Sequence, residues 1–311
     1  MEFFRKVTRF PFMATRRRWY VVSAVIILGS LVALAVRGLN FGIDFTGGVV
    51  MEFAFPEAAN LEQVRSALEK AGIGDASVQS FGTASDVLVR VLPNEGSDTN
   101  QLGQEVLTAI QGYAPGAELR RTEVVGPQVG EELAEKGALA VLFTFLLIMA
   151  YVAFRFQWKL GVGAIAAALH DPFVILGVFA ITGLTFDLPA LAAILAVIGY
   201  SLNDTVVVFD RIRERFLSMR KGTPEQVIDA AVNETLSRTI MTSGTTMITV
   251  LALLFFGGEI LRSFATSLAI GIVVGTYSSI YIASALALDL KLTARDLMPE
   301  KREKDAIDEL P

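Results

Sequence analysis

Six long apolar stretches dominate this sequence and constrain its fold more than any other feature. About 20 apolar residues in a helix are enough to cross the hydrocarbon core of a bilayer. The composition agrees, because 53% of the residues are hydrophobic and 19% are charged, against about 25% charged in soluble domains. We predict a polytopic α-helical membrane protein with six transmembrane helices. The predicted spans are residues 19–37, 137–155, 160–182, 186–209, 239–256 and 263–288.

Basic residues predict how the chain is oriented, because cytoplasmic loops of membrane proteins are enriched in Lys and Arg. With the N-terminus in the cytoplasm, 19 of the 27 basic residues fall on that side and 8 on the other. The first stretch follows residues 16–18, which are all Arg, and is longer than the apolar core of a signal peptide. It is therefore expected to remain as an anchor. The segments predicted to be cytoplasmic are residues 1–18, 210–238 and 289–311.

Residues 38–136, predicted to be periplasmic, have the patterns of a small folded domain. Alternating apolar residues predict strands, and apolar residues three and four apart predict helices. The expected elements are strands at 49–55, 77–81, 87–92 and 118–125, a turn at 82–86, and helices at 61–72 and from Ser97 or Asp98 to Gly112. The βαββαβ order is that of a ferredoxin-like α+β domain. This fold hosts many functions, so it predicts a module and no chemistry.

The composition and motifs exclude several kinds of chemistry. The chain has no cysteine, hence no disulfide and no thiolate ligand, and its single histidine rules out a multi-histidine metal centre. Paired catalytic aspartates on two spans, an H-E-x-x-H motif and a serine–histidine arrangement are all missing from the sequence. We expect no enzymatic activity, no metal, no cofactor and no nucleic-acid partner.

Asp204 in the fourth predicted span needs an explanation, because a charge at membrane depth costs about 2.5–3.5 kcal/mol on insertion scales. It lies between Asn203 and Thr205, nearly two helical turns inside the cytoplasmic exit marked by Asp210. That depth is about 9 Å at 1.5 Å per residue. Burial favours the neutral form of a carboxyl, and a nearby cation favours its charged form. Asp204 is therefore a candidate site for reversible proton binding.

Arg238, at the start of the fifth predicted span, is the candidate cation. A run of small polar residues that includes Thr242, Ser243 and Thr246 follows it in an otherwise apolar helix. Such hydroxyls either line a hydrated path or hydrogen-bond neighbouring helices. The residues alone leave two interpretations of Arg238 open, a partner of Asp204 or an interfacial anchor.

His170 and Asp171 are the second polar pair at membrane depth. They lie at the centre of the third predicted span and are followed by Pro172. A histidine beside a carboxyl is able to relay protons. The alternative is that both side chains hydrogen-bond to neighbouring helices and hold the bundle together. The residues themselves favour neither interpretation.

Three motifs carry a resemblance to a known family. They are residues 41–48, with Gly42, Asp44, Gly47 and Gly48; residues 198–214, around Asp204; and residues 237–246, which begin with Ser237-Arg238-Thr239. Together they resemble the SecD/SecF family of protein-export subunits, in the form of its SecF members. The resemblance extends over essentially the whole chain, including the small external domain and the His170-Asp171 pair.

The resemblance implies an accessory subunit of the Sec protein translocase, related to the resistance-nodulation-division superfamily. Such a subunit pairs with SecD in the bacterial inner membrane and uses the proton-motive force to drive late steps of protein export. The implied partners are SecD, the SecYEG translocon, the exported unfolded polypeptide, membrane lipids and protons. The resemblance also implies that Asp204 and Arg238 carry proton transfer.

Other functions fit parts of the same pattern. A proton-coupled small-molecule or lipid efflux subunit of this superfamily would share the carboxylate, but it needs a larger external domain than residues 38–136 provide. An intramembrane enzyme would have to use His170 and Asp171 without a recognisable catalytic arrangement. In a purely structural scaffold, Asp204 would be an inert packing residue.

Overall fold

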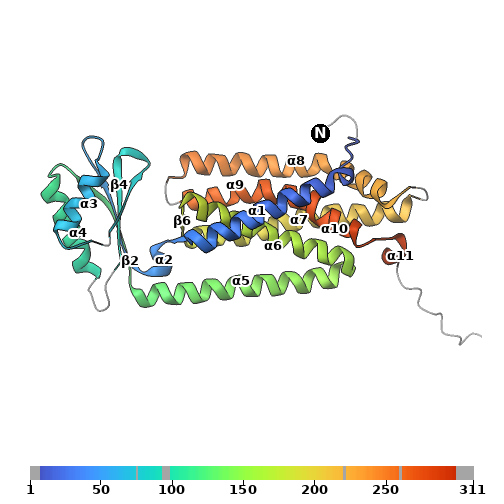
Figure 1. Ribbon diagram of the computed structural model, residues 1–311, viewed down its shortest axis with the longest axis horizontal. Coiled ribbons are helices and arrows are strands. Elements are labelled where there is room, and N and C mark those ends of the chain that lie inside the picture. Colours follow the sequence, from blue (N-terminus) through green and yellow to red (C-terminus); the bar gives the residue numbers. More distant parts are fainter. Residues whose placement is uncertain (1–7, 75, 93–98, 220–221, 259–260, 299–311) are drawn as a thin grey trace, which may run out of the picture.

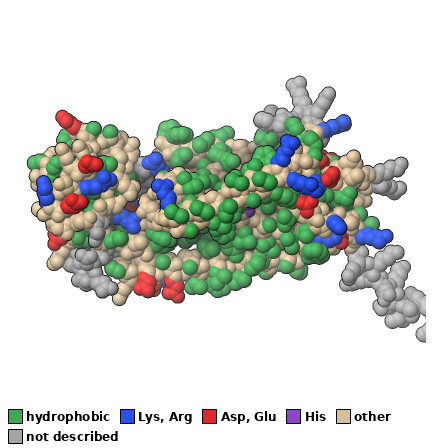
Figure 2. All heavy atoms as spheres, viewed as in Figure 1, with side chains coloured by type: hydrophobic (Ala, Val, Ile, Leu, Met, Phe, Trp, Pro, Cys, Tyr) green, Lys and Arg blue, Asp and Glu red, His purple; other side chains and the backbone are tan. Residues whose placement is uncertain are grey.

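The computed structural model describes residues 8–74, 76–92, 99–219, 222–258 and 261–298. An α/β domain lies at one end, and a bundle of long helices forms the rest (Figure 1). Six helices in the described part of the chain are long and apolar enough to cross a membrane, which confirms the predicted six-helix membrane fold. Figure 2 shows hydrophobic side chains over the bundle, while most charged side chains lie on the α/β domain and at the far end. An apolar band between two charged ends is expected of a membrane-spanning bundle.

Three of the long helices form the centre of the bundle. The helices are α1 (Arg16–Arg37), α5 (Pro127–Arg155), α6 (Trp158–Thr182), α7 (Leu188–Ser218), α8 (Pro224–Phe256) and α9 (Arg262–Ser278). Helix α9 continues through a π-helical turn, η3 (Ser279–Ala283), into α10 (Ser284–Asp289). In their most apolar stretches, 61% of the residues of α6, 56% of those of the α9–α10 span and 44% of those of α7 are buried, against 11% for the spans that contain α1, α5 and α8. Helices α6, α7 and α9 are therefore central, and α5 and α8 lie on opposite sides (Figure 1).

Helix α5 starts earlier than predicted, at Pro127 instead of residue 137. Gly126 is the N-cap and Pro127 occupies the first helical position, where its missing N–H costs nothing. The first turns carry Glu131, Glu132 and Lys136, so hydropathy detects only the apolar part of this helix. Residues 127–136 therefore belong to the bundle helix and not to the predicted external domain.

The segment at residues 210–238, predicted to be cytoplasmic, is mostly helical. Helix α7 continues to Ser218, and α8 begins at Pro224 behind a capping box formed by Thr223 and Gln226. Hydropathy ends each predicted span where charges begin, whereas a polar sequence can continue a helix. Ion pairs of Arg211 and Arg215 with Glu234 tie these extensions together.

The α/β domain is a four-stranded antiparallel sheet with two helices. Its elements are β2 (Gly48–Ala54), α3 (Leu61–Lys70), β3 (Ser77–Phe81), β4 (Thr83–Val91), α4 (Thr99–Tyr113) and β5 (Glu118–Val125). The strands lie in the order β3-β4-β2-β5, and the βαββαβ order along the chain is the predicted one. The predicted turn at 82–86 is too long, since Gly82 alone joins β3 to β4, with φ at +74°. Ser97 and Asp98 lie outside the described residues.

Only one face of the sheet is covered by α3 and α4, and the other face is turned toward the bundle (Figure 1). Alternation in β2 buries Val49, Met51 and Phe53 against the helices. The opposite face and the adjoining end of the bundle enclose a cleft of about 520 Å³. Glu52 and Arg90 line it on the sheet. Residues 42–44, which precede β2, and residues 187–189, at the start of α7, line the same cleft.

Close packing of α1 on α6 depends on Gly177. A Cβ atom at this position would lie 2.7 Å from the Cα of Ser30 on α1, so the two helices would have to separate. We expect Gly177→Ala to lower the free energy of unfolding by about 1–3 kcal/mol. Gly29→Ala is the matched control, because nothing lies within 4 Å of its added Cβ. Equal thermal stability of the two purified variants in detergent would contradict this packing.

Candidate proton-transfer site

Asp204 lies on the face of α7 that is turned into the bundle and is only 5% exposed. The hydroxyl of Thr239 on α8 donates a hydrogen bond of 3.4 Å to its Oδ1 atom. The other oxygen, Oδ2, is buried and has no hydrogen-bond partner among the residues that the structure describes. A carboxylate here would bury an unpaired negative charge, whereas a proton on Oδ2 removes that charge. The geometry suits a group that holds a proton.

Arg238 is exposed on the surface of α8, one residue before Thr239. No ion pair or hydrogen bond between the side chains of Arg238 and Asp204 occurs in the described part of the chain. Thr239 faces the carboxyl, and Arg238 faces away from the bundle. The pairing of Asp204 with Arg238 that the sequence suggested is therefore indirect in this structure.

The predicted hydroxyl run on α8 divides into two groups by its contacts. Ser243 is buried, and its hydroxyl hydrogen-bonds to Thr276 on α9 at 2.8 Å and accepts from Tyr200 on α7 at 3.4 Å. Thr242 and Thr246 donate to carbonyl oxygens of their own helix. Ser243 therefore links three helices, whereas the hydrogen bonds of the two threonines stay within α8.

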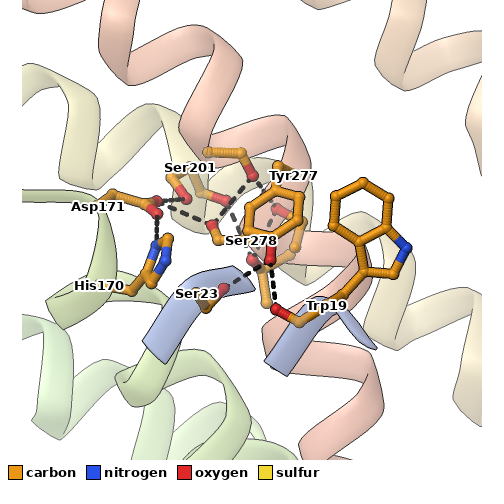
Figure 3. Close-up of polar contacts among 10 residues, drawn as sticks. Trp19, Ser23, His170, Asp171, Ser201, Tyr277 and Ser278 are labelled. Carbon is orange, nitrogen blue, oxygen red and sulfur yellow. Dashed lines mark hydrogen bonds and ion pairs between the residues drawn. The ribbon is translucent and has the colours of Figure 1, made fainter. Parts of the chain in front are cut away.

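Asp171 is the centre of a second polar cluster and is completely buried in α6 (Figure 3). Its Oδ2 atom accepts hydrogen bonds from Ser201 on α7 at 2.5 Å and from Ser278 on α9 at 3.0 Å. Its Oδ1 atom lies 3.0 Å from Nδ1 of His170. Both carboxyl oxygens thus have partners, and the side chain connects three central helices.

The polar contacts continue from this cluster toward α1. The Tyr277 hydroxyl lies 2.6 Å from the Ser23 hydroxyl and donates to the Trp19 carbonyl at 2.9 Å (Figure 3). The Tyr277 ring lies 5.9 Å from the His170 ring, measured between centroids. The Nε2 atom of His170 is buried without a hydrogen-bond partner among the described residues. The structure therefore brings His170 and Asp171 together with hydroxyls from α1, α7 and α9.

The two buried carboxyls have separate partners, but both are connected to helix α7. Asp204 is part of that helix, and Asp171 on α6 accepts a hydrogen bond from it. Ser201, which contacts Asp171, precedes Asp204 by three residues and lies on a neighbouring turn. Thr205, next to Asp204, donates to the Ser201 carbonyl and to the Ser279 hydroxyl in η3. The position of α7 is thus constrained by both clusters.

The glycine motif lies beside the start of α7, whereas Asp204 lies near the middle of that helix. Gly42 and Gly47 flank a short helix, α2 (Ile43–Thr46), that contacts the start of α7 through Asp44. Asp187 is the N-cap of α7. Gly48 is the first residue of β2. The motif therefore lies at the junction with the α/β domain and away from Asp204.

No group of three or more His, Asp or Glu side chains that could hold a metal ion occurs among the described residues. The candidate site consists of the Asp204 carboxyl, Thr239 beside it on α8 and the adjacent Asp171 cluster. The carboxyl and imidazole groups of this site can bind and release protons.

Most of the chain matches a known family of membrane proteins. Residues 105–293 match the family described as "Protein export membrane protein SecD/SecF, C-terminal", and residues 32–55 match the "SecD/SecF GG Motif". The chain belongs to the SecD/SecF family. Its glycine motif at residues 42–48 lies within the second match, so the resemblance seen in the sequence is confirmed.

Relatives in the SecD/SecF family match this chain over nearly its full length. It is 48% identical over 303 residues to "Protein translocase subunit SecF" of Vibrio alginolyticus, covering 96% of both chains. It is 46% identical over 308 residues to the protein of the same name from Pseudomonas aeruginosa, covering 98% of this chain and 99% of that one. These relatives are similar in length as well as in sequence.

A solved SecDF structure has the same fold. The crystal structure of SecDF from Thermus thermophilus, described as a translocon-associated membrane protein, superposes with a TM-score of 0.80 at 39% identity. The match covers 91% of this chain and 39% of the longer SecDF chain. A second SecDF structure, in a super-membrane-facing form, gives a TM-score of 0.68 at the same identity and coverage. The conformation described here is closer to the first structure.

Proposed function

We propose that this chain is the SecF-type subunit of a Sec protein translocase and uses the proton-motive force, together with a SecD-type subunit, in late steps of protein export. The translocase names of its relatives and the fold shared with SecDF support this proposal. Its substrate is an unfolded polypeptide that leaves a SecYEG-type translocon. The distribution of Lys and Arg favours cytoplasmic termini and a periplasmic α/β domain in a bacterial inner membrane.

The observation that carries the proposal is the buried, half-satisfied carboxyl of Asp204 between α7 and α8. Holding a proton, Asp204 needs no cation and keeps the Thr239 contact. Releasing the proton creates a buried charge, which favours an approach of Arg238 from the next position on α8. Protonation thereby biases the packing of α7 against α8, and a bias between two packings is the requirement for coupling.

A polar strip on the surface of the bundle is the proposed contact with SecD. Asn203 on α7 and Arg238 and Thr245 on α8 are exposed at membrane depth, and Thr242 is half-buried between them. The three α8 residues follow the i, i+4, i+7 spacing of one helix face. Polar groups facing lipid are costly, so helices of a partner subunit fit this surface better than lipid does.

Completion of an arrested export intermediate tests the function. Inverted membrane vesicles containing the translocon, SecD and this chain should complete export after ATP is removed, but only while the proton gradient persists. Because Arg238 supplies the counter-charge, Arg238→Met should stop this completion, and Arg238→Lys, which keeps the charge, should retain part of it. Undiminished completion without this chain or after an ionophore would contradict the proposal. A change in drug sensitivity with normal export would instead favour efflux.

A further inference from the structure

The linker between α1 and the α/β domain is fastened to the loop between α6 and α7. Its strand β1 (Asn40–Phe41) pairs in parallel with β6 (Thr185–Phe186). The Gly42 N–H donates to the Phe186 carbonyl at 2.8 Å. The Phe45 ring, two residues after Ile43, stacks on the Phe186 ring at a centroid distance of 5.8 Å. Two segments far apart in sequence thus form one junction at the start of α7.

Asp44 from this linker caps helix α7. The first four N–H groups of a helix lack partners within it. In α7, Leu188 donates its N–H to Oδ2 of Asp44 at 2.8 Å, and Ala190 donates to Oδ1 of the N-cap Asp187 at 2.8 Å. Pro189, between them, has no N–H. The free donors of the first turn are therefore satisfied by two carboxyls, one of which lies 144 positions away in the chain.

The same linker is fixed to the α/β domain and to α5. Arg90 on β4 donates to the Asn40 side chain at 3.2 Å and to the Thr46 hydroxyl at 3.4 Å. Gly47 has a φ of +65°, and a Cβ atom there would lie 2.9 Å from the Cα of Pro127. A Cβ atom on Gly130 would lie 2.6 Å from the Gly47 nitrogen. Both connections of the α/β domain to the bundle therefore meet at α2.

We infer that Asp44 is a positioning residue that couples the α/β domain to α7, the helix that carries Asp204. Asp44 bonds to α7 on one side, while its own short helix is held by the domain and by α5 on the other. Asp204 lies 16 residues beyond Leu188, about 24 Å along a continuous helix. A displacement of α7 caused by proton binding at Asp204 is thereby passed to the domain. This inference rests on the proposed function.

The test measures export and proton uptake in the same vesicles with translocon, SecD and this chain. Asp44→Ala removes the acceptor of the Leu188 N–H, whereas Asp44→Asn keeps a side-chain oxygen in its place. Export completed per proton should fall by about fivefold in the first variant and recover in the second. Proton uptake should persist in both, because Asp204 is unchanged. Glu69→Ala, which removes an exposed charge from α3, is the control.

A cross-link provides an independent test, because the chain has no cysteine of its own. Asn40 and Thr185 are paired Cα partners, so cysteines at both positions can form a disulfide across the junction. Oxidation of this pair in the Asp44→Ala background should restore export per proton, and reduction should abolish the gain. Unchanged coupling in Asp44→Ala, or no restoration by the cross-link, overturns the inference. Proton-independent export in the unmodified protein overturns the proposed function instead.

Discussion

Replacement of Asp204 by Asn should reduce export in ATP-depleted vesicles to the level seen after the proton gradient has collapsed. Asn preserves the shape and the oxygen that accepts from Thr239, but it does not titrate in the physiological range. The electrical part of the gradient supplies about 2.3 kcal/mol per charge per 100 mV, a bias of about 50-fold between two states for each proton. Without a titrating group at this position, the proton gradient cannot shift the equilibrium between the two packings of α7 and α8.

The measurement is the fraction of an arrested export intermediate completed in energised vesicles. Because the substitution is isosteric and leaves no new buried charge, we expect the stability of Asp204→Asn to change by no more than about 1 kcal/mol. ATP-driven initiation should be retained, which separates loss of coupling from loss of folding. Full proton-driven completion by Asp204→Asn would remove Asp204 from the mechanism.

Replacement of Asp171 by Leu should destabilise the bundle without acting specifically on proton coupling. The substitution removes a carboxyl acceptor of the Ser201 and Ser278 hydroxyls and the hydrogen-bond partner of Nδ1 of His170 in a buried site, and Ser278 keeps only the Gly275 carbonyl. Losses of this kind in membrane bundles and buried polar networks amount to about 2–4 kcal/mol in total. We therefore propose that the cluster holds α6, α7 and α9 in register.

Asp171→Asn distinguishes this structural role from a proton relay. The amide retains one acceptor and offers donors to the serine hydroxyls, which can accept as well as donate. Thermal unfolding in detergent should show a large loss of stability for Asp171→Leu and a small one for Asp171→Asn, with proton-driven export preserved in the latter. Loss of proton-driven export in a stable Asp171→Asn protein would instead assign a relay to His170 and Asp171.

Local patterns in the sequence predicted the elements well because burial and backbone geometry leave a direct periodic signature. Strand β5 has the predicted bounds, Glu118–Val125, and all six apolar helices are present. Hydropathy did not predict the polar extensions of α5, α7 and α8, because a helix outside the hydrocarbon core needs caps and helix-forming residues rather than apolar ones. Thr223 and Gln226 carried that capping signal.

The candidate site was predictable in its residues but not in its contacts. Asp204, Arg238, His170 and Asp171 stand out because charged groups in apolar helices are rare. The side-chain directions depend on how α7 and α8 are rotated against each other, which no local pattern specifies. The sequence therefore left open whether Arg238 pairs with Asp204, whereas in the structure Thr239 occupies the position facing the carboxyl.

The contact of Ser278 with Asp171, and the neighbouring contact of Tyr277 with Ser23, were missed for the same reason. Ser278 and Tyr277 lie in an apolar span where serine and tyrosine are unremarkable, and Ser23 belongs to a helix distant in sequence. The sequence does show two adjacent serines, Ser278 and Ser279. In the structure they lie where the helix changes to a π-helical turn. Such turns occur often at functional sites. Sequence alone does not show the turn.

Infrared difference spectroscopy tests the central claim, the reversible protonation of Asp204, most directly. Spectra of the reconstituted complex with SecD, recorded as the pH is switched across the membrane, should contain a carbonyl band of a protonated carboxyl. The account predicts that this band is lost in Asp204→Asn and retained in Asp171→Asn. A carboxyl band that persists unchanged in Asp204→Asn, or a spectrum of the unmodified protein without any such band, would contradict it.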